Sequence, residues 1–264
     1  MKGAIIGDII GSIYEFDNYK GEPNDFELFT PINFYTDDTI CTCGIAKALL
    51  EKDNPSPTDY ARNLWNFCNK ISASGHEAGY GGNFQKWLKQ NPPKPYNSYG
   101  NGAAMRISAI PYFYKDNFEE MLKQTNAATL ISHNHKESFK GAKTVSSAIW
   151  YLLNGATKEN IRKLVNKLYE LPPVKKIEFN ETCQGTVPIC FSILLESNSF
   201  EEAMRKAVWV GGDTDTICAI VGSMAEPLFG IPEEIEKKMW EYLNDDIKNI
   251  VRDFERRNKN DNRN

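Results

Sequence analysis

The sequence lacks a long apolar segment and an excess of basic residues. No stretch approaches the roughly 20 apolar residues that a membrane-spanning helix needs. The apolar N-terminal run has no basic region before it and is broken by Asp8 and Gly11, so we expect no signal peptide. The 31 Lys and Arg are outnumbered by 35 Asp and Glu, which gives a formal net charge of −4. Because a general nucleic-acid binder needs a basic surface to displace counterions, that class is disfavoured.

Zinc-type ligand patterns are also missing. The chain has only three His, and none of its Cys forms a CxxC pair or a Cys/His set with zinc spacing. The six cysteines lie mostly within apolar helical patterns, and they are Cys41, Cys43, Cys68, Cys183, Cys190 and Cys218. Reduced, buried cysteine is the ordinary state in a cytosolic protein. We therefore expect a cytoplasmic protein without membrane partners, and a monomer.

Neither linkers nor strands are evident. The proline-bearing stretches are short, and each separates segments with helical patterns. No internal repeat or low-complexity block occurs before a polar ending, so we predict one domain over residues 1–255 and a frayed polar tail over 256–264. Alternation with period two is scarce and βαβ alternation is absent, which favours an all-α fold of about ten or more helices.

Helical periodicity is what the sequence does contain. Tyr60, Leu64, Phe67 and Ile71 recur at spacings of three and four, which places them on one helix face. Further segments show the same pattern or a buried-helix composition. They are residues 39–50, 118–132, 141–154, 159–170, 200–209, 215–229 and 232–254.

Two acidic clusters precede apolar helices. The first is Thr36-Asp37-Asp38-Thr39, where one Asp or Thr would suffice as a helix cap. Two adjacent carboxylates repel each other unless a proton or cation intervenes, so capping and metal binding are both open for this cluster alone. Residues 211–216 (GGDTDT) repeat the design with Asp213 and Asp215. Together the clusters indicate convergence on Mg²⁺ or Mn²⁺, which prefer oxygen ligands, and four carboxylates would need roughly two such ions.

Two glycine-rich segments accompany the clusters. Residues 98–106 (SYGNGAAMR) concentrate small residues before a predicted helix, a pattern that suits either a phosphate cradle or a simple turn. In residues 3–15, Gly3, Gly7 and Gly11 leave one helix face without side chains, so that face can pack closely. Asp8 lies in this segment with Glu15 about two turns further along. Asp8 is either exposed to solvent or buried for a function.

The motifs GDIIGSIYE, YTDDT, SYGNGAAMR and GGDTDT occur in this order over residues 7–216. Together they closely resemble the ADP-ribosylglycohydrolase family, which includes dinitrogenase-reductase-activating glycohydrolases and ADP-ribosyl-acceptor hydrolases. The SYGNGAAMR loop and the surroundings of Glu15 are most similar to the serine-type branch. The resemblance implies an all-α, single-domain orthogonal helical bundle with a binuclear Mg²⁺ (or Mn²⁺) centre. The metal ligands that it implies are Thr36, Asp37, Asp38, Asp213, Asp215 and Thr216.

The resemblance also implies roles for substrate-binding residues. The loop that would wrap the diphosphate and ribose includes Ser98, Tyr99, Gly100, Asn101, Gly102 and Met105. Tyr99 matches an aromatic near the adenosine, and His133 matches a histidine near the adenosine and diphosphate. A helix cap or a core hydrogen-bonding role is the alternative for His133. Glu15 matches a glutamate near the scissile bond, and we predict Glu15 and Asp38 as the catalytic pair, since cleavage at an anomeric carbon commonly uses two carboxyl groups.

The predicted reaction is metal-dependent hydrolysis of the N- or O-glycosidic bond between ADP-ribose and its acceptor. The predicted substrate is an ADP-ribosylated protein or a small ADP-ribose conjugate, and an ADP-ribosylated nucleic acid stays possible. The acceptor itself (serine, arginine, a base or an acetyl ester) is open. A two-metal phosphoester hydrolase and a non-catalytic ADP-ribose-binding relative are the alternatives, although a binding protein would be expected to lose metal-site aspartates that this chain keeps.

Overall fold

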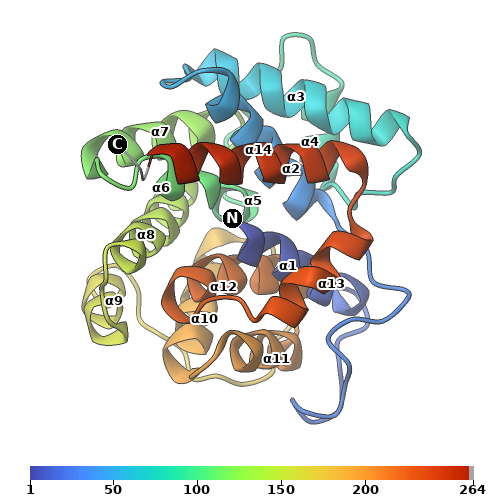
Figure 1. Cartoon of the computed structure of the whole chain (residues 1–264), viewed down its shortest axis with the longest axis vertical. Helices are drawn as coiled ribbons and strands as arrows, with labels where there is room; N and C mark the ends of the chain where they lie inside the picture. The colour runs from blue at the N-terminus through green and yellow to red at the C-terminus, as the bar shows by residue number, and fades with distance from the viewer. Residues whose placement is uncertain (262–264) are drawn as a thin grey trace.

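The computed structural model describes residues 1–261, with side chains described to residue 258, and this part of the chain is all-helical (Figure 1). Its only β-type pairing is an isolated bridge between Gly100 and Thr182. The helices are α1 (Lys2–Gly11), η1 (Ser12–Tyr14, a 3-10 turn), α2 (Asp37–Glu51), α3 (Pro57–Ala73), α4 (Gly82–Leu88), α5 (Gly102–Met105), α6 (Ala109–Phe113), α7 (Phe118–Leu130), α8 (Lys136–Leu153), α9 (Lys158–Val165), α10 (Cys183–Glu196), α11 (Phe200–Val210), α12 (Thr214–Phe229), α13 (Glu233–Tyr242) and α14 (Asp245–Asp261).

Helix α12 lies at the centre and packs against α1, α8, α10 and α11 (Figure 1). Its contact with α1 is backbone to backbone. A Cβ atom built on Gly3 would lie 2.1 Å from the carbonyl oxygen of Gly222, and one on Gly7 would lie 2.0 Å from that of Cys218. One on Gly11 would lie 2.6 Å from the Cα of Asp215. The close packing predicted for the glycine face is therefore confirmed, and it brings α1 against the start of α12.

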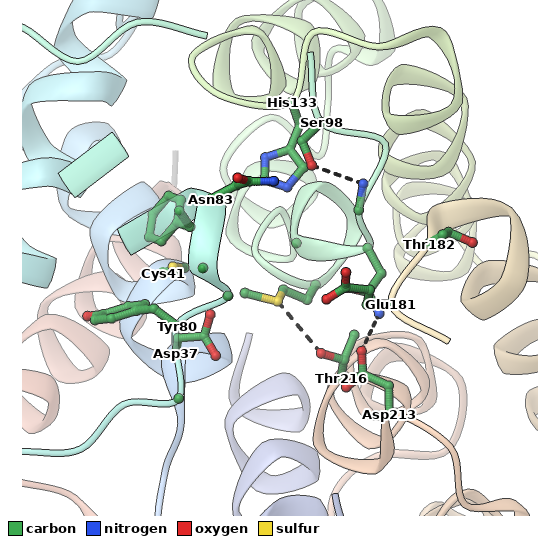
Figure 2. A pocket seen from close by; sticks show the side chains of 18 of the residues that line it. Asp37, Cys41, Tyr80, Asn83, Ser98, His133, Glu181, Thr182, Asp213 and Thr216 are labelled. Atoms are coloured by element: carbon green, nitrogen blue, oxygen red, sulfur yellow. Dashed lines mark hydrogen bonds between the residues drawn. The ribbon is translucent and has the colours of Figure 1, made fainter. Parts of the chain in front are cut away.

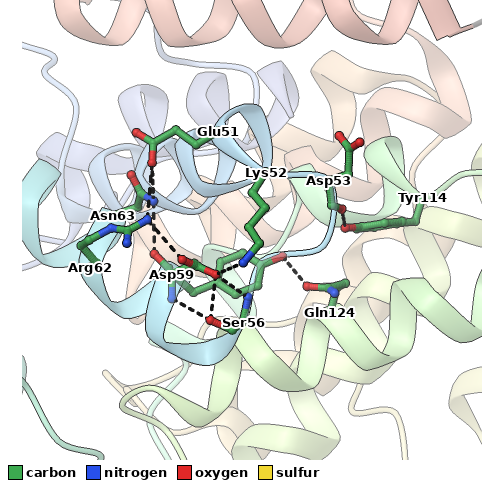
Figure 3. Close-up of polar contacts among 10 residues, drawn as sticks. Glu51, Lys52, Asp53, Ser56, Asp59, Arg62, Asn63, Tyr114 and Gln124 are labelled. Carbon is green, nitrogen blue, oxygen red and sulfur yellow. Dashed lines mark hydrogen bonds and ion pairs between the residues drawn. The ribbon is translucent and has the colours of Figure 1, made fainter.

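Helix α2 packs against α3, and α14 crosses it on the other side (Figure 1). The α2–α3 connection is fixed by a capping box, in which the Ser56 side chain accepts from the Asp59 N–H and the Asp59 carboxylate accepts from the Ser56 N–H (Figure 3). Pro57 at the first helical position suits this start, since it has no N–H to satisfy. The connection thus sets the direction of α3 along α2.

The all-helical fold predicted from the sequence is confirmed, and the differences concern boundaries. The predicted segment 232–254 is two helices, because α13 ends at Tyr242 and α14 begins at Asp245 after Asn244, whose side chain accepts from the Ile247 N–H. Helix α9 ends at Val165, short of residue 170, and α1 gives way to a 3-10 turn after Gly11. Helix α10 was not predicted from the sequence; it is buried on nearly all sides and contains Pro188.

The tail predicted over 256–264 is wrong for residues 256–261, which continue α14. Residues 262–264 lie outside the described part of the chain. All six cysteines are buried and free, as expected. Within residues 1–261, no helix combines the length and the apolar character needed to cross a membrane.

Candidate active site

A cavity of about 740 Å³ is lined by residues from the starts of α2 and α12 and from the loop before α5. Figure 2 shows Asp213 and Thr216 facing Asp37 across the cavity, with His133 at its other end. Most residues predicted for the site line this cavity. They are Glu15, Asp37, Ser98, Tyr99, Gly100, Asn101, Gly102, Met105, His133, Asp213, Asp215 and Thr216. A cavity of this volume is in the range that holds small molecules and cofactors.

The first acidic cluster is tied to α1 through Asp8. The Asp8 carboxylate accepts from the Thr36 N–H at 2.9 Å, the Thr36 hydroxyl at 2.6 Å and the Thr39 N–H at 3.0 Å. Thr36 is also the N-cap of α2, since its hydroxyl oxygen accepts from the Asp38 N–H at 3.3 Å. The capping and site interpretations of this cluster are therefore compatible. Asp8, which the sequence left unassigned, is fully buried.

The second acidic cluster begins α12 but does not cap it. Asp213 occupies the N-cap position without a side-chain cap bond, and its carboxylate instead accepts from the Asn101 amide at 2.7 Å. Gly211 and Gly212 have φ angles of 75° and 78°, a conformation that favours glycine, so the chain turns tightly before α12. Thr216 donates its hydroxyl to Asp38 at 3.1 Å, which joins the two clusters directly.

The two clusters form two overlapping groups of carboxylates. Asp8, Asp38 and Asp215 offer oxygens that lie within 4.8 Å of one another, and so do Glu15, Asp213 and Asp215. Asp215 belongs to both groups. The convergence expected from the sequence is present, and each group has the size and the oxygen chemistry to hold one divalent cation.

The electrostatics of these groups disfavour their fully charged, cation-free state. Burial, and then the charge of Asp215, raise the pKa of Asp8 to about 7 and that of Glu15 to about 8. The same two causes raise the pKa of Asp38 and Asp213 well above the ordinary range. Within the described residues, no Lys or Arg forms an ion pair with any of these carboxylates. The centre therefore carries repulsion that the protein itself does not offset.

Two buried oxygen atoms without hydrogen-bond partners also indicate that the protein itself does not complete this centre. Oδ1 of Asp38 and Oγ1 of Thr39 are buried, and neither has a hydrogen-bond partner in the described part of the chain. A buried carboxylate oxygen without a donor costs free energy unless a cation or water contacts it. Asp37 is half-buried and lines the cavity but belongs to neither carboxylate group. Asp37 thus lines the cavity without belonging to the centre, while Asp38 belongs to the centre without lining the cavity.

The glycine-rich loop differs from the open phosphate cradle that its composition suggested. The Gly100 N–H donates to Ser98 Oγ at 3.1 Å, and the Asn101 N–H donates to the Glu181 carbonyl at 2.8 Å. The N–H of Gly102 has no partner among the described residues. Neither Gly100 nor Gly102 has a positive φ, so the backbone conformation does not exclude a side chain at either position. The limit at Gly102 is steric, because a Cβ would lie 3.1 Å from Nε2 of His133.

His133 is buried and follows α7, and it does not cap a helix. Its Nδ1 lies 2.8 Å from Ser132 Oγ, while Nε2 faces the glycine-rich loop. Burial and the nearby charge of Arg106 lower the pKa of His133 well below its ordinary value, so the ring is neutral at pH 7. His135 is the residue that caps α8. It also contacts the half-exposed ring of Tyr99, with ring centroids 5.5 Å apart.

Several residues of the site were missed in the sequence. The amide of Asn18 donates to the Gly212 carbonyl at 3.0 Å and to the Thr214 hydroxyl at 3.1 Å, which holds the loop before α12. Phe179 and Glu181 line the cavity from the irregular segment before α10. No periodicity or motif marks either position. Asp8 was also left unassigned, but the sequence does mark it, because a carboxylate on a glycine-rich apolar helix is unusual.

Comparison with known proteins gives consistent results. The family model described as ADP-ribosylglycohydrolase matches residues 1–263. ADP-ribosylhydrolase ARH3 of Mus musculus is 22% identical over 311 residues, covering 88% of this chain and 83% of its own length. ADP-ribosylarginine hydrolase Tri1 of Pseudomonas putida is 23% identical, covering 91% of this chain and 73% of its own. A solved structure titled "ADP-ribosylglycohydrolase-related protein complex" superposes with a TM-score of 0.72 at 21% identity, over 97% of this chain and 95% of that one.

Proposed function

The chain belongs to the ADP-ribosylglycohydrolase family, and on that premise we propose that it hydrolyses the glycosidic bond between ADP-ribose and an acceptor, releasing ADP-ribose. The observation that carries the proposal is the pair of carboxylate groups sharing Asp215 beside a cavity walled by the glycine-rich loop. The proposed substrate is an ADP-ribosylated protein or a small ADP-ribose conjugate.

We propose that the two carboxylate groups hold two Mg²⁺ or Mn²⁺ ions. The donors fit such ions, because the groups offer carboxylate oxygens and no His or Cys. The unpartnered Oδ1 of Asp38 and the absence of a compensating cation within residues 1–258 support the same assignment. Asp8, Asp38 and Asp215 would hold one ion, and Asp213 and Asp215 the other, with Glu15 beside it. When bound, the ions supply electrostatic stabilisation and make a nearby water more acidic.

The protein's own groups would then position the substrate and move the proton. In the reaction, a water oxygen bonds to the anomeric carbon, the bond from that carbon to the acceptor breaks, and the acceptor leaves with a proton. Glu15 is half-buried and lines the cavity, whereas Asp38 is buried and does not. We therefore assign proton transfer to the Glu15 carboxyl and a ligand-holding role to Asp38, in contrast to the pair expected from the sequence.

The remaining contacts would hold the ADP-ribose. The free N–H of Gly102 and the neutral ring of His133 lie along one wall of the cavity, where they can contact the diphosphate and ribose. Asn101 acts indirectly, because its amide is occupied by Asp213 and by the Thr186 hydroxyl at 3.0 Å. It is therefore a positioning residue for Asp213.

The proposal is tested by incubating the protein and Mg²⁺ with serine-linked, arginine-linked and acetyl-linked ADP-ribose and separating the products. We expect free ADP-ribose from at least one of them, and none after treatment with a chelator. Release of phosphate or of AMP in place of ADP-ribose would indicate a phosphoester hydrolase. Binding of ADP-ribose without turnover of any conjugate would indicate a binding protein.

A further inference from the structure

Two phenylalanines are exposed beside the acidic centre. Phe16 is 84% exposed and Phe179 is 48% exposed, and both line the cavity. Their rings are stacked, with centroids 6.2 Å apart and an interplanar angle of 26°. Exposed aromatic pairs are unfavourable in water unless a ligand or partner covers them, and here they lie at a cavity with polar residues around them.

The chain around each of the two rings fixes the position of the Phe16–Phe179 pair. Phe16 directly follows Glu15 at the end of the η1 turn. Phe179 belongs to a segment that is anchored on both sides: the Ile177 N–H donates to the Val210 carbonyl at 3.0 Å, and the Glu181 carbonyl accepts from Asn101. This segment therefore passes from the end of α11 to the glycine-rich loop. Phe16 adjoins Glu15 along the chain, and Tyr99 belongs to the glycine-rich loop.

ADP-ribose contains one aromatic group, its adenine. Of the aromatic side chains that line the cavity, the exposed ones form two platforms, Tyr99 and the Phe16–Phe179 pair. Tyr99, supported by His135, stands at the glycine-rich loop, where the free N–H of Gly102 would receive the diphosphate. The second platform is next to the carboxylate that we assign to proton transfer at the scissile bond. On the basis of the proposed function, we infer that the Phe16–Phe179 pair binds the acceptor group, and that it favours the planar guanidinium of an ADP-ribosylated arginine.

The charge of the cavity supports a cationic acceptor. Glu181 lines the same wall as Asp213 (Figure 2), and it has no ion pair in the described part of the chain. Five carboxylates line the cavity against two cationic side chains, Lys86 on α4 and Arg106. Arg106 is buried and donates to the Ala128 carbonyl and the Ser132 hydroxyl. A guanidinium is planar and weakly hydrated, and it stacks on aromatic faces near carboxylates. A serine hydroxyl gains little from an aromatic face or from a nearby carboxylate.

This inference differs from the serine-type similarity of the motifs, and the reason is where the motifs lie. The similarity rests on the glycine-rich loop and on the surroundings of Glu15, which would contact parts of the substrate common to every acceptor. The two aromatic rings are instead placed to contact the part that differs among acceptors.

The test uses the double variant Phe16→Ala/Phe179→Ala, with Phe34→Ala as the matched control. Phe34 is also exposed, at 40%, but it does not line the cavity. For each protein with Mg²⁺, kcat/KM is measured on arginine-linked and serine-linked ADP-ribosyl peptides, and the Kd for free ADP-ribose is measured by calorimetry. We expect wild type to prefer the arginine-linked peptide. The double variant should lose at least tenfold in kcat/KM on that peptide, with the Kd for ADP-ribose within twofold, and Phe34→Ala should match wild type.

The single variant Phe179→Tyr keeps an aromatic face and should retain the preference, which a merely structural role for the ring would not require. An equal loss on both peptides, or a weaker Kd for ADP-ribose, overturns the inference, because the rings would then contact the common part of the substrate. A wild-type preference for the serine-linked peptide also overturns it and leaves the glycohydrolase activity intact. Failure of wild type to release ADP-ribose from any conjugate contradicts the proposed function itself.

Discussion

The acidic residues at the two ends of helix α2 lie in opposite environments, and their pKa values shift in opposite directions. At the C-terminal end, Glu51 pairs with Lys47, and this contact lowers the pKa of Glu51. Glu51 also accepts from the Asn63 amide at 3.0 Å (Figure 3), which lowers its pKa further. Nearby, Asp59 accepts from Lys52 at 2.8 Å, and its pKa is lowered too. At the N-terminal end, burial and neighbouring carboxylates raise the pKa of Asp38, and no Lys or Arg among the described side chains forms an ion pair with it.

The comparison shows what an acidic residue requires for structure and what it requires for ligand binding. Around Glu51 and Asp59 every carboxylate has a donor or a cation from the chain itself, so this region is complete as folded. The centre around Asp215 has its carboxylates in place and lacks the positive charge that would balance them. Such a site is completed by something from solution, and the following predictions are ordered from the largest expected effect to the smallest.

Removing one charge from the centre should abolish turnover, whereas removing one at the other end of α2 should not. We expect Asp215→Asn to lower ADP-ribose release about 10²-fold or more, since this residue is shared by both carboxylate groups. The control Glu51→Gln should retain wild-type turnover, and both variants should keep the helical CD spectrum. If Asp215→Asn retained more than about one per cent of activity, the centre would be peripheral to the chemistry.

Divalent cation should stabilise the protein, and more so at high pH. The raised pKa values mean that the folded, cation-free protein keeps protons that the unfolded chain loses. The contribution of these groups to stability is therefore present below about pH 4 and is lost as the pH rises through about 7 for Asp8 and about 8 for Glu15. A cation needs the deprotonated groups, so its effect grows over the same pH range.

At 100 times its dissociation constant, Mg²⁺ should add about 2.7 kcal/mol, or roughly 5 °C in Tm, at pH 8.5. The gain should be much smaller at pH 5.5. Thermal unfolding of wild type and of Asp215→Asn, with and without Mg²⁺, checks this. A gain in Tm that did not depend on pH, or that persisted in Asp215→Asn, would place the ion elsewhere.

Filling the space beside Gly102 should weaken ADP-ribose binding and leave the cation alone. We expect Gly102→Val to weaken ADP-ribose binding at least tenfold, about 1.4 kcal/mol, because the side chain would press on His133 and cover the free N–H. Gly102→Ala should show a smaller loss. Calorimetry with ADP-ribose and separately with Mg²⁺ distinguishes the two ligands, and unchanged ADP-ribose affinity would mean that the loop is only a turn.

The smallest effect is expected where α3 begins. Ser56→Ala removes one half of the capping box and should lower the free energy of unfolding by about 1 kcal/mol, measured by urea denaturation. Turnover per folded molecule should stay at the wild-type level. A loss of turnover in this variant would show that the α2–α3 connection and the acidic centre are coupled, which the comparison of the two ends excludes.

The sequence predicted the amphipathic helices well, because their apolar residues recur with helical spacing. It failed at α10, where apolar residues surround the whole helix, and at the α13–α14 boundary, where Asn244 interrupts a continuous pattern. Helices α2 and α12 are also buried on nearly all sides, but each follows an acidic cluster that marks its start, and no such cluster precedes α10. At Asn244 the apolar pattern continues while the cap changes the direction of the chain.

For the site, the sequence brought the two acidic clusters together but did not assign Asp8. Whether a carboxylate on α1 faces solvent or the core depends on which helix covers it, and α12 is more than 200 residues away along the chain. The hydrogen bonds that Gly100 and Asn101 form within the protein likewise could not be predicted from the sequence. They depend on the segment before α10, which has no pattern that fixes its path.

The direct backbone contact between α1 and α12 also bears on how a new chain matures on the ribosome. Ribosomes add about 5–20 residues per second, so on the order of 10–40 s separate the synthesis of α1 from that of its partner. During this interval α12 is not yet present to cover the glycine face of α1, and Asp8 does not yet have Asp215 beside it. The glycine-rich loop and His133 are made well before α12. Assembly of the acidic centre is consequently a late event of biosynthesis, and a nascent chain halted before residue 213 carries the wall of the cavity without the carboxylates that complete it.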